Sequence, residues 1–417
     1  MSIESFIQPK FNYPFMWFLD IALGQMQKVV HNVQEIVVND SDKEMLRSLS
    51  KERVIYLSNH PTTKEPPVTY QISNLMCSRF NYMAGREVFD WANGFVGNII
   101  QNMGAYSVIA GASDRESLKM TRQILSKPEG KLVLFPEGEP TGAENDNLLP
   151  FQPGIAQLGI WGYEDAIKSD PKADIIVLPA FVKYRIIGSK EEIRSNVDRS
   201  LEIMETRLGI SKHGKDVVHR LLSIGKRLVE KAEKEFGIIP ENDQSFDYRI
   251  GKLRHTILNY VADTTGIKNF NKDAHAIDKL RKILSTFEMV TVGLPDPKKE
   301  LPTVESAKWG RKFCQRAYDF IAIKTDYLTA LPSAERIYEW ISRFESELLR
   351  FTYPRPQKAY VTFAEPFRIS SYYPEYKKDK KGVVETITQR IKNDVQGLLD
   401  KEVKRSEPLF PKDYIFM

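Results

Sequence analysis

The chain has 417 residues, of which 42% are hydrophobic and 28% are charged, with a net charge of +5. This length supports one large core or two to three ordinary ones, and the balance of residue types excludes disordered and fibrous proteins. Only two cysteines, Cys77 and Cys314, are present, which excludes a disulfide framework and predicts a reducing compartment.

The first 45 residues are expected to form an amphipathic helical segment. We expect no signal peptide, and no run reaches the roughly 18 apolar residues that a membrane-spanning helix requires. Within residues 11–30, apolar side chains recur near helical spacing, with Trp17 beside them: Phe15, Phe18, Leu19, Ala22 and Met26. Such a helix either packs on the core or lies in a membrane interface with its aromatic rings inserted.

Strand and helix patterns alternate through residues 46–187. The expected strands are 54–58, 82–84, 132–135 and 174–186, and the expected helices are 68–76, 113–125 and 154–167. Pro179 is expected to interrupt the last strand, and Ser113 with Glu116 forms a capping box that starts the second helix. This alternation predicts an α/β domain with a mixed, largely parallel sheet flanked by helices.

Residues 188–354 show helical periodicity in six successive segments, without a strand pattern between them. Between residues 355 and 417, a strand pattern returns at 358–367 and a helix pattern follows at 382–403. Because the strand pattern resumes, we interpret the helical block as a large all-helical insertion into the α/β domain, whose core continues in the C-terminal segment.

One turn after a strand carries a histidine and a carboxylate. His60 follows the strand at 54–58, and Glu65 stands five residues later, directly before Pro66 and Pro67. Proline favours the first helical positions, so we expect a helix to begin at Glu65 and the turn to fold its carboxylate back towards His60. A helix capping box of Thr62 and Glu65 is the alternative, but it would place Pro66 at the fourth helical position.

A second turn, Phe135-Pro136-Glu137-Gly138, also ends a strand. Ligands of α/β sheets gather outside the carboxyl ends of the strands, so both turns are predicted to face one site. A histidine oriented by a carboxylate is a general base that can deprotonate a hydroxyl. The two turns together therefore suggest acyl transfer to an alcohol.

Other chemistries lack their signatures. No phosphate-loop, dinucleotide, hydrolase-elbow or zincin motif occurs. The remaining histidines have no ligand pattern and are interpreted as surface or packing residues: His31, His213, His219, His255 and His275. The sequence therefore predicts no metal site.

These motifs together resemble those of the glycerolipid acyltransferases, of the glycerol-3-phosphate and 1-acylglycerol-3-phosphate type. The stretch SNHPTTKEP, which begins at residue 58, resembles the first family motif, N-H-x-x-x-x-D. LVLFPEGEPTG, which begins at residue 132, resembles the third, F-P-E-G-T-R-S, and IIVLPAFVKYR and VTFAEPF are similar to later family strands. The resemblance covers about residues 50–187 and 355–400.

By this resemblance, His60 takes the proton from an acceptor hydroxyl, which attacks a thioester on coenzyme A or acyl carrier protein. Glu65 replaces the family's usual aspartate. The implied substrate-binding residues are Asn59, Phe135, Pro136, Glu137 and Gly138. No cofactor is implied beyond acyl-CoA or acyl carrier protein as co-substrate. The implied partners are a lipid acceptor and a membrane surface, not nucleic acid, and the implied role is phospholipid biosynthesis by a cytoplasmic protein peripheral to the membrane.

The sequence departs from the family at two arginines that are expected to bind the acceptor's phosphate, because these positions fall on Ala110 and Pro140. A guanidinium matches phosphate geometry bidentately, so we expect an unphosphorylated or differently presented hydroxyl as acceptor. Arg86 and Arg115 are candidates to replace the missing arginines, with a plain surface role as the favoured alternative for each. The helical insertion has no recognised counterpart, and acyl-tunnel covering, carrier-protein docking, membrane contact and simple packing remain open.

Two alternatives to acyl transfer remain. A thioester or ester hydrolase would use the same pair of residues with water as acceptor. A non-catalytic acyl- or membrane-binding protein on the same fold would explain the altered motifs as lost catalysis.

Overall fold

The computed structural model describes residues 6–109, 114–138, 144–152, 154–211, 216–241, 244–293, 301–319 and 324–410. The chain divides into two compact units. The first, the α/β unit, comprises Met1–Thr141, Asn145–Arg185 and Pro356–Val403. The second, the helical unit, comprises Gly142–Glu144, Ile186–Arg355 and Lys404–Met417.

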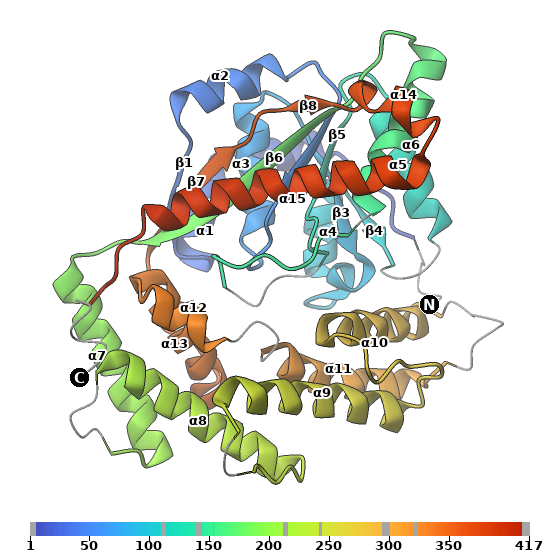
Figure 1. Ribbon diagram of the computed structural model, residues 1–417. Helices are drawn as coiled ribbons and strands as arrows, with labels where there is room; N and C mark the ends of the chain where they lie inside the picture. The colour runs from blue at the N-terminus through green and yellow to red at the C-terminus, as the bar shows by residue number, and fades with distance from the viewer. Residues whose placement is uncertain are drawn as a thin grey trace. The chain divides into compact units, whose positions relative to one another are not determined.

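The α/β unit is built on one sheet, which has eight strands among the described residues (Figure 1). These are β1 (Val33–Val37), β2 (Val54–Ser58), β3 (Asn81–Gly85), β4 (Ala105–Val108), β5 (Lys131–Leu134), β6 (Ile176–Ile186), β7 (Gln357–Phe363) and β8 (Phe367–Arg368). The order is β1-β7-β6-β2-β5-β3-β4, and β8 pairs with β6. Strand β2 runs parallel to both of its neighbours, whereas β8 is antiparallel to β6. The predicted α/β fold with a mixed, largely parallel sheet is therefore confirmed.

Helices cover both faces of this sheet (Figure 1). The helices of the α/β unit are α1 (Tyr13–Val30), α2 (Asp40–Ser48), α3 (Glu65–Leu75), α4 (Phe95–Asn102), α5 (Arg115–Ser126), α6 (Gly154–Ser169), α14 (Tyr373–Tyr376) and α15 (Lys380–Lys404), with short 3₁₀ turns η1 (Arg86–Asp90) and η2 (Ile369–Ser371). Ile55 and Leu57 of β2 share a core with α5, α6 and α15. The alternate residues Val54 and Tyr56 share another core with α2 and α3. Every residue of β2 is thus buried, as expected for a central parallel strand.

Three local expectations differ from the structure. Pro179 does not interrupt β6, because one missing N–H removes at most one hydrogen bond of the ladder and the strand continues on either side. Helix α5 begins at Arg115 with Asp114 as its N-cap, and Ser113 lies outside the described residues. The expected strand at 358–367 consists of two strands, β7 and β8.

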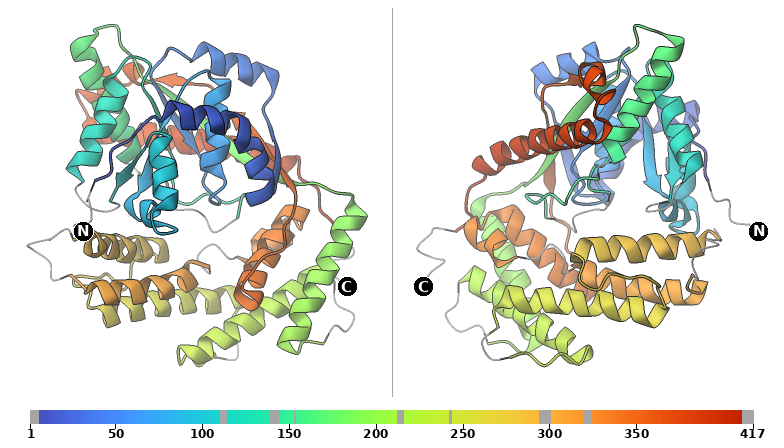
Figure 2. Two further views of the ribbon diagram at one scale, coloured as in Figure 1. Left: turned by 180° about the vertical axis from the view of Figure 1, so that it is seen from behind. Right: turned by 45° about the vertical axis from the view of Figure 1, so that its right-hand side comes forward.

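The helical unit contains seven helices among its described residues. They are α7 (Lys190–Leu208), α8 (Val217–Glu235), α9 (Phe246–Thr265), α10 (Ala276–Thr291), α11 (Val304–Asp319), α12 (Thr325–Ala330) and α13 (Ala334–Leu349). Helices α9, α10 and α11 lie side by side (Figure 2), and one apolar core joins all seven. One of the six predicted helical segments, 306–328, is divided between α11 and α12.

Candidate active site

The sheet brings the two strand-end turns together. β2 and β5 are parallel neighbours with Leu57 opposite Leu134, so the chain leaves both strands at the same edge of the sheet. Helix α3 then begins at Glu65, with prolines in its first turn and Lys64 as N-cap. The capping-box alternative is therefore wrong, because the helix starts at the carboxylate itself rather than three residues before it.

His60 and Glu65 form a direct contact. His60 Nδ1 lies 2.9 Å from Glu65 Oε2, and the Glu65 side chain is fully buried while 16% of the His60 side chain is exposed. The carboxylate also accepts hydrogen bonds from the Thr62 N–H at 2.9 Å, the Thr62 hydroxyl at 2.8 Å and the Tyr184 hydroxyl at 2.6 Å. Four donors thus hold Glu65, as a buried carboxylate requires.

These contacts define which nitrogen of His60 is basic. An ionised carboxylate only accepts hydrogen bonds, so the contact with Glu65 requires a proton on His60 Nδ1. The neutral ring then carries its lone pair on Nε2, the nitrogen remote from Glu65. This arrangement suits a general base whose orientation and tautomer are set by a buried partner.

Tyr184 stays a hydrogen-bond donor in this network. Burial raises the pKa of the Tyr184 phenol well above its usual value, and the negative charge of Glu65 raises it further. Because a raised pKa extends the neutral range upward, the hydroxyl keeps its proton at physiological pH. The neutral hydroxyl therefore donates a hydrogen bond to Glu65 and adds no second negative charge beside it.

The second turn supports His60 from the other side. The Phe135 ring stacks on the His60 ring with centroids 4.3 Å apart and planes at 19°. Glu137 is fully buried. Its carboxylate accepts hydrogen bonds from the backbone N–H of His60 at 2.8 Å and from the backbone N–H of Leu149 at 2.7 Å. Phe135 and Glu137 thus fix the ring and the backbone of His60.

Gly138 and Pro136 complete the second turn. The Gly138 N–H donates to the Phe135 carbonyl at 3.0 Å, and Gly138 has a φ of +76°, which favours glycine. The Pro136 carbonyl accepts from the Gln152 N–H at 2.8 Å. A Cβ on Gly138 would lie 3.1 Å from the Gln152 side chain, so this position is restricted both by its conformation and by space.

Asn59 is anchored to the neighbouring strand. Its side chain accepts from the Val182 N–H at 2.7 Å and donates to the Val182 carbonyl at 3.1 Å. Asn145 makes the same kind of contact, since it donates to the Val182 carbonyl and accepts from the Tyr184 N–H, each at 2.8 Å. The two amides continue the hydrogen bonding of β6 beyond the end of β2, and Asn59 thereby positions the residue that follows it, His60.

A model of the family described as Acyltransferase matches residues 37–183, a range that contains both turns. These residues thus form a domain of the acyltransferase family. The resemblance to the glycerolipid acyltransferases seen in the sequence is thereby confirmed, and acyl transfer is the reaction type that the family supports. No curated protein and no solved structure matches the chain.

Three residues of this site were not predicted from the sequence. They are Tyr184, Asn145 and Thr62, the last as a hydrogen-bond donor to Glu65. Thr62 carried a signal, because its spacing to Glu65 suggested an interaction that was assigned to helix capping. Tyr184 and Asn145 carried none, since each is at least 79 residues from the first motif. The family match ends one residue before Tyr184.

The candidate phosphate-binding positions of the acyltransferase are only partly described. Ala110 and Pro140 lie outside the described residues. Arg86 is buried and pairs with Asp90 at 2.9 Å, whereas Arg115 is exposed at the start of α5. Within the described ranges there is no group of three or more side chains suited to a metal ion, and no helix has the length and apolar character needed to cross a bilayer.

Proposed function

We propose that this acyltransferase moves a fatty acyl group from a thioester donor to a hydroxyl of a lipid or lipid precursor, with His60 as the general base. The observation that carries the proposal is the buried Glu65 carboxylate at 2.9 Å from His60 Nδ1, which leaves Nε2 as the basic atom. The donor is acyl-CoA or an acylated carrier protein, as the family resemblance implies.

In the first step, His60 Nε2 takes the proton of the acceptor hydroxyl as its oxygen attacks the thioester carbonyl carbon. The new C–O bond gives a tetrahedral intermediate, and the imidazolium is stabilised by the Glu65 carboxylate. In the second step, the C–S bond breaks and the departing sulfur receives the proton from His60. The products are an ester and a free thiol, and the base returns to its starting state.

The direct test is donor consumption by the purified protein, measured as thiol release from acyl-CoA with lipid-extract vesicles as acceptor, followed by mass analysis of the products. His60→Ala is expected to lose about 10²–10⁴-fold in rate, and His219→Ala, a partly exposed histidine of the helical unit, is the matched control. Unchanged transfer in His60→Ala refutes the assignment.

The same assay separates the alternatives. A hydrolase releases free fatty acid when no alcohol is supplied, and this release depends on His60. A non-catalytic binding protein binds vesicles or acyl-CoA without turnover, and its binding is the same in His60→Ala. A new acylated lipid made by the wild type alone supports the transferase, and the mass of that product identifies the acceptor.

We further propose that α1 provides contact with a membrane surface. Its face towards the unit packs Met16, Leu19 and Leu23 against Tyr70 of α3, whereas large apolar side chains on the remaining surface are exposed. These include Trp17 at 59%, Phe18 at 58%, Ile21 at 86% and Val29 at 82%. An exposed helical face rich in aromatic residues can insert at the boundary between head groups and acyl chains.

Vesicle flotation tests this contact. Because Trp17 and Ile21 are exposed, Trp17→Ser/Ile21→Ser is expected to keep the fold and to reduce the floated fraction several-fold, with lower activity on vesicles. Ile239→Ser, which changes an isolated isoleucine that is 85% exposed in the helical unit, is expected to float like the wild type. Equal flotation of the double variant and the wild type refutes the contact but leaves the role of His60 intact.

A further inference from the structure

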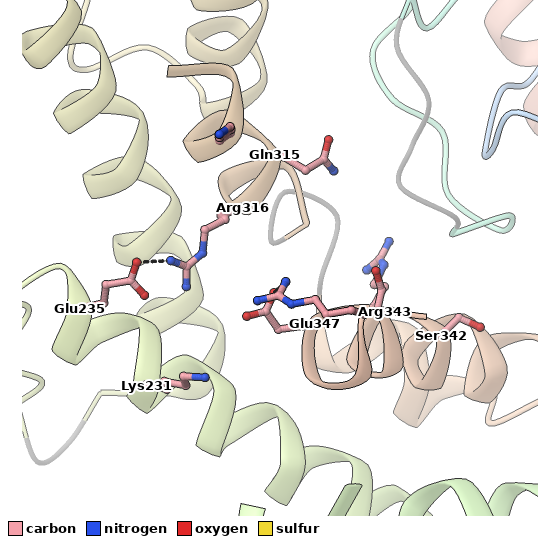
Figure 3. A pocket seen from close by; sticks show the side chains of 10 residues that line it. Lys231, Glu235, Gln315, Arg316, Ser342, Arg343 and Glu347 are labelled. Carbon is pink, nitrogen blue, oxygen red and sulfur yellow. Dashed lines mark hydrogen bonds and ion pairs between the residues drawn. The ribbon is translucent and has the colours of Figure 1, made fainter. Parts of the chain in front are cut away.

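A basic cavity lies within the helical unit, and its lining includes no residue of the acyltransferase motifs. It has a volume of about 760 Å³ and is lined by residues of α8, α11 and α13 (Figure 3). Five of the ten lining residues are cationic, and two are glutamates, so the lining has a net charge of +3. The cationic residues are Lys231, Lys312, Arg316, Arg343 and Arg350.

The cations converge on the cavity because of helical spacing. Residues three and four apart share one face of a helix. Lys312 and Arg316 have this spacing on α11, and Arg343 lies seven residues, or two turns, before Arg350 at the end of α13. Each of the three helices thus presents at least one cation to the same space.

Some of these charges are compensated and others are not. Arg316 pairs with Glu235, and Arg343 pairs with the buried Glu144 at 3.2 Å. Arg350 lies 3.7 Å from Glu347 in an exposed pair, which contributes little. Lys231 and Lys312 have no ion-pair or hydrogen-bond partner within the described ranges. Two lysines on different helices, α8 and α11, are therefore available to an external anion.

Helix ends account for only part of this arrangement, since Arg316 is in the last turn of α11 and Arg350 caps the end of α13. Basic residues in the last turn of a helix complement the helix dipole, and the effect fades beyond that turn. Lys312 lies seven residues before the end of α11, and Arg343 lies six before the end of α13. Their convergence on one cavity calls for a ligand rather than for the dipole.

The lining defines the chemistry of that ligand. None of the ten residues is aliphatic or aromatic, and the uncharged ones are glutamine and serine, which donate hydrogen bonds. Such a lining suits a hydrophilic ligand better than an acyl chain. Its volume falls in the range of about 300–1,000 Å³ of small-molecule sites, and lysine and arginine are the residues that bind phosphate.

We propose that the helical unit binds a small hydrophilic molecule carrying two or more phosphate groups, with Lys231 and Lys312 contributing the charges that are otherwise unpaired. The arginines and serines of α13 supply further donors on the facing wall. This site is independent of the His60 chemistry, so either proposal can fail without the other.

Calorimetric titration of the whole protein with inorganic pyrophosphate and tripolyphosphate tests the site. We expect saturable binding that tightens from pyrophosphate to tripolyphosphate and weakens with salt. Lys231→Glu/Lys312→Glu is expected to bind at least tenfold more weakly. Lys226→Glu/Lys308→Glu is the control, because it makes the same charge change at exposed positions of the same two helices outside the cavity, and it is expected to bind within about twofold of the wild type.

Three results would overturn the proposal. The first is no binding of either phosphate compound at low salt, and the second is an equal loss of affinity in the two double variants. The third is a polyglutamate peptide that binds as tightly as tripolyphosphate with the same dependence on Lys231. The last result would assign the cavity to an acidic protein segment. Phosphatidylcholine vesicles with and without a phosphoinositide distinguish the source of the phosphates. Extra binding that requires the phosphoinositide and is displaced by tripolyphosphate identifies a lipid head group, whereas equal binding to both kinds of vesicle identifies a free solute. Circular dichroism of each variant establishes that it is folded.

Discussion

Replacing Glu65 by glutamine isolates its charge from its shape. The amide has nearly the same size as the carboxylate, and the Thr62 and Tyr184 hydroxyls can rotate to accept hydrogen bonds from its NH₂ group. The amide oxygen can still accept from the Thr62 N–H and from His60 Nδ1. We therefore expect Glu65→Gln to fold, while the imidazolium formed during catalysis loses its negative partner.

The expected loss follows from these contacts. A hydrogen bond to a charged group is worth about 1.5–3 kcal/mol, and the bond between Glu65 and His60 becomes fully ionic only when His60 holds the acceptor's proton. Losing about 2–3 kcal/mol of that stabilisation lowers the rate about 30- to 150-fold. If the amide instead turns its NH₂ group towards Nδ1, His60 is held in the wrong tautomer and the loss is larger.

The assay is thiol release at saturating donor, together with the melting temperature of each variant. Glu116→Gln is the matched control, because Glu116 is also in the first turn of a helix but is exposed, and it is expected to be as active as the wild type. Glu65→Asp, which restores the family's usual residue on a shorter side chain, is expected to fall between the wild type and Glu65→Gln. Folded Glu65→Gln protein with a rate within threefold of the wild type would contradict the assigned role of the carboxylate.

Three further substitutions probe the residues around the base. Tyr184→Phe is expected to lower the rate about tenfold by removing a hydrogen bond to a buried charge. Because burial raises the pKa of the Tyr184 phenol, the ratio of wild-type to variant rates should stay constant from pH 6 to 9. A ratio that falls towards one above pH 8 would show that the tyrosine ionises. Gly138→Ala should destabilise the protein by about 1–2 kcal/mol in urea unfolding, because the φ of Gly138 is positive and the new Cβ meets Gln152. Unchanged stability would mean that the turn adapts. Phe135→Leu removes the ring stacked on His60, a contact worth about 0.5–1.5 kcal/mol, so kcat should fall about 2- to 12-fold; a change in KM alone would instead indicate that Phe135 binds substrate.

Local patterns predicted most of the α/β unit. Four consecutive apolar or aromatic residues, Val54 to Leu57, sufficed to place β2. The prolines after Glu65 placed the start of α3, because proline restricts both its own φ and the conformation of the preceding residue. His60 and Glu65 are five residues apart, so the same turn that these rules predict also brings their side chains together. The expected apolar face of α1 was less accurate, since Phe18 and Met26 are exposed while Met16 and Leu23 are buried. A helix with large apolar side chains all round does not reveal which face packs.

The rest of the site depends on strand order, which no local pattern contains. β6 lies beside β2 with Ala180 opposite Ser58, the last residue of β2, so the six residues of β6 that follow Ala180 extend past the end of its neighbour. Alternate residues of a strand share a face, and Ala180, Val182 and Tyr184 belong to the same core as α3. Tyr184 therefore reaches the first turn of α3, where Glu65 is. The sequence predicted both the last residue of β6 and the start of α3. The bond between them joins residues 119 positions apart, and it follows only once β6 is known to be the neighbour of β2.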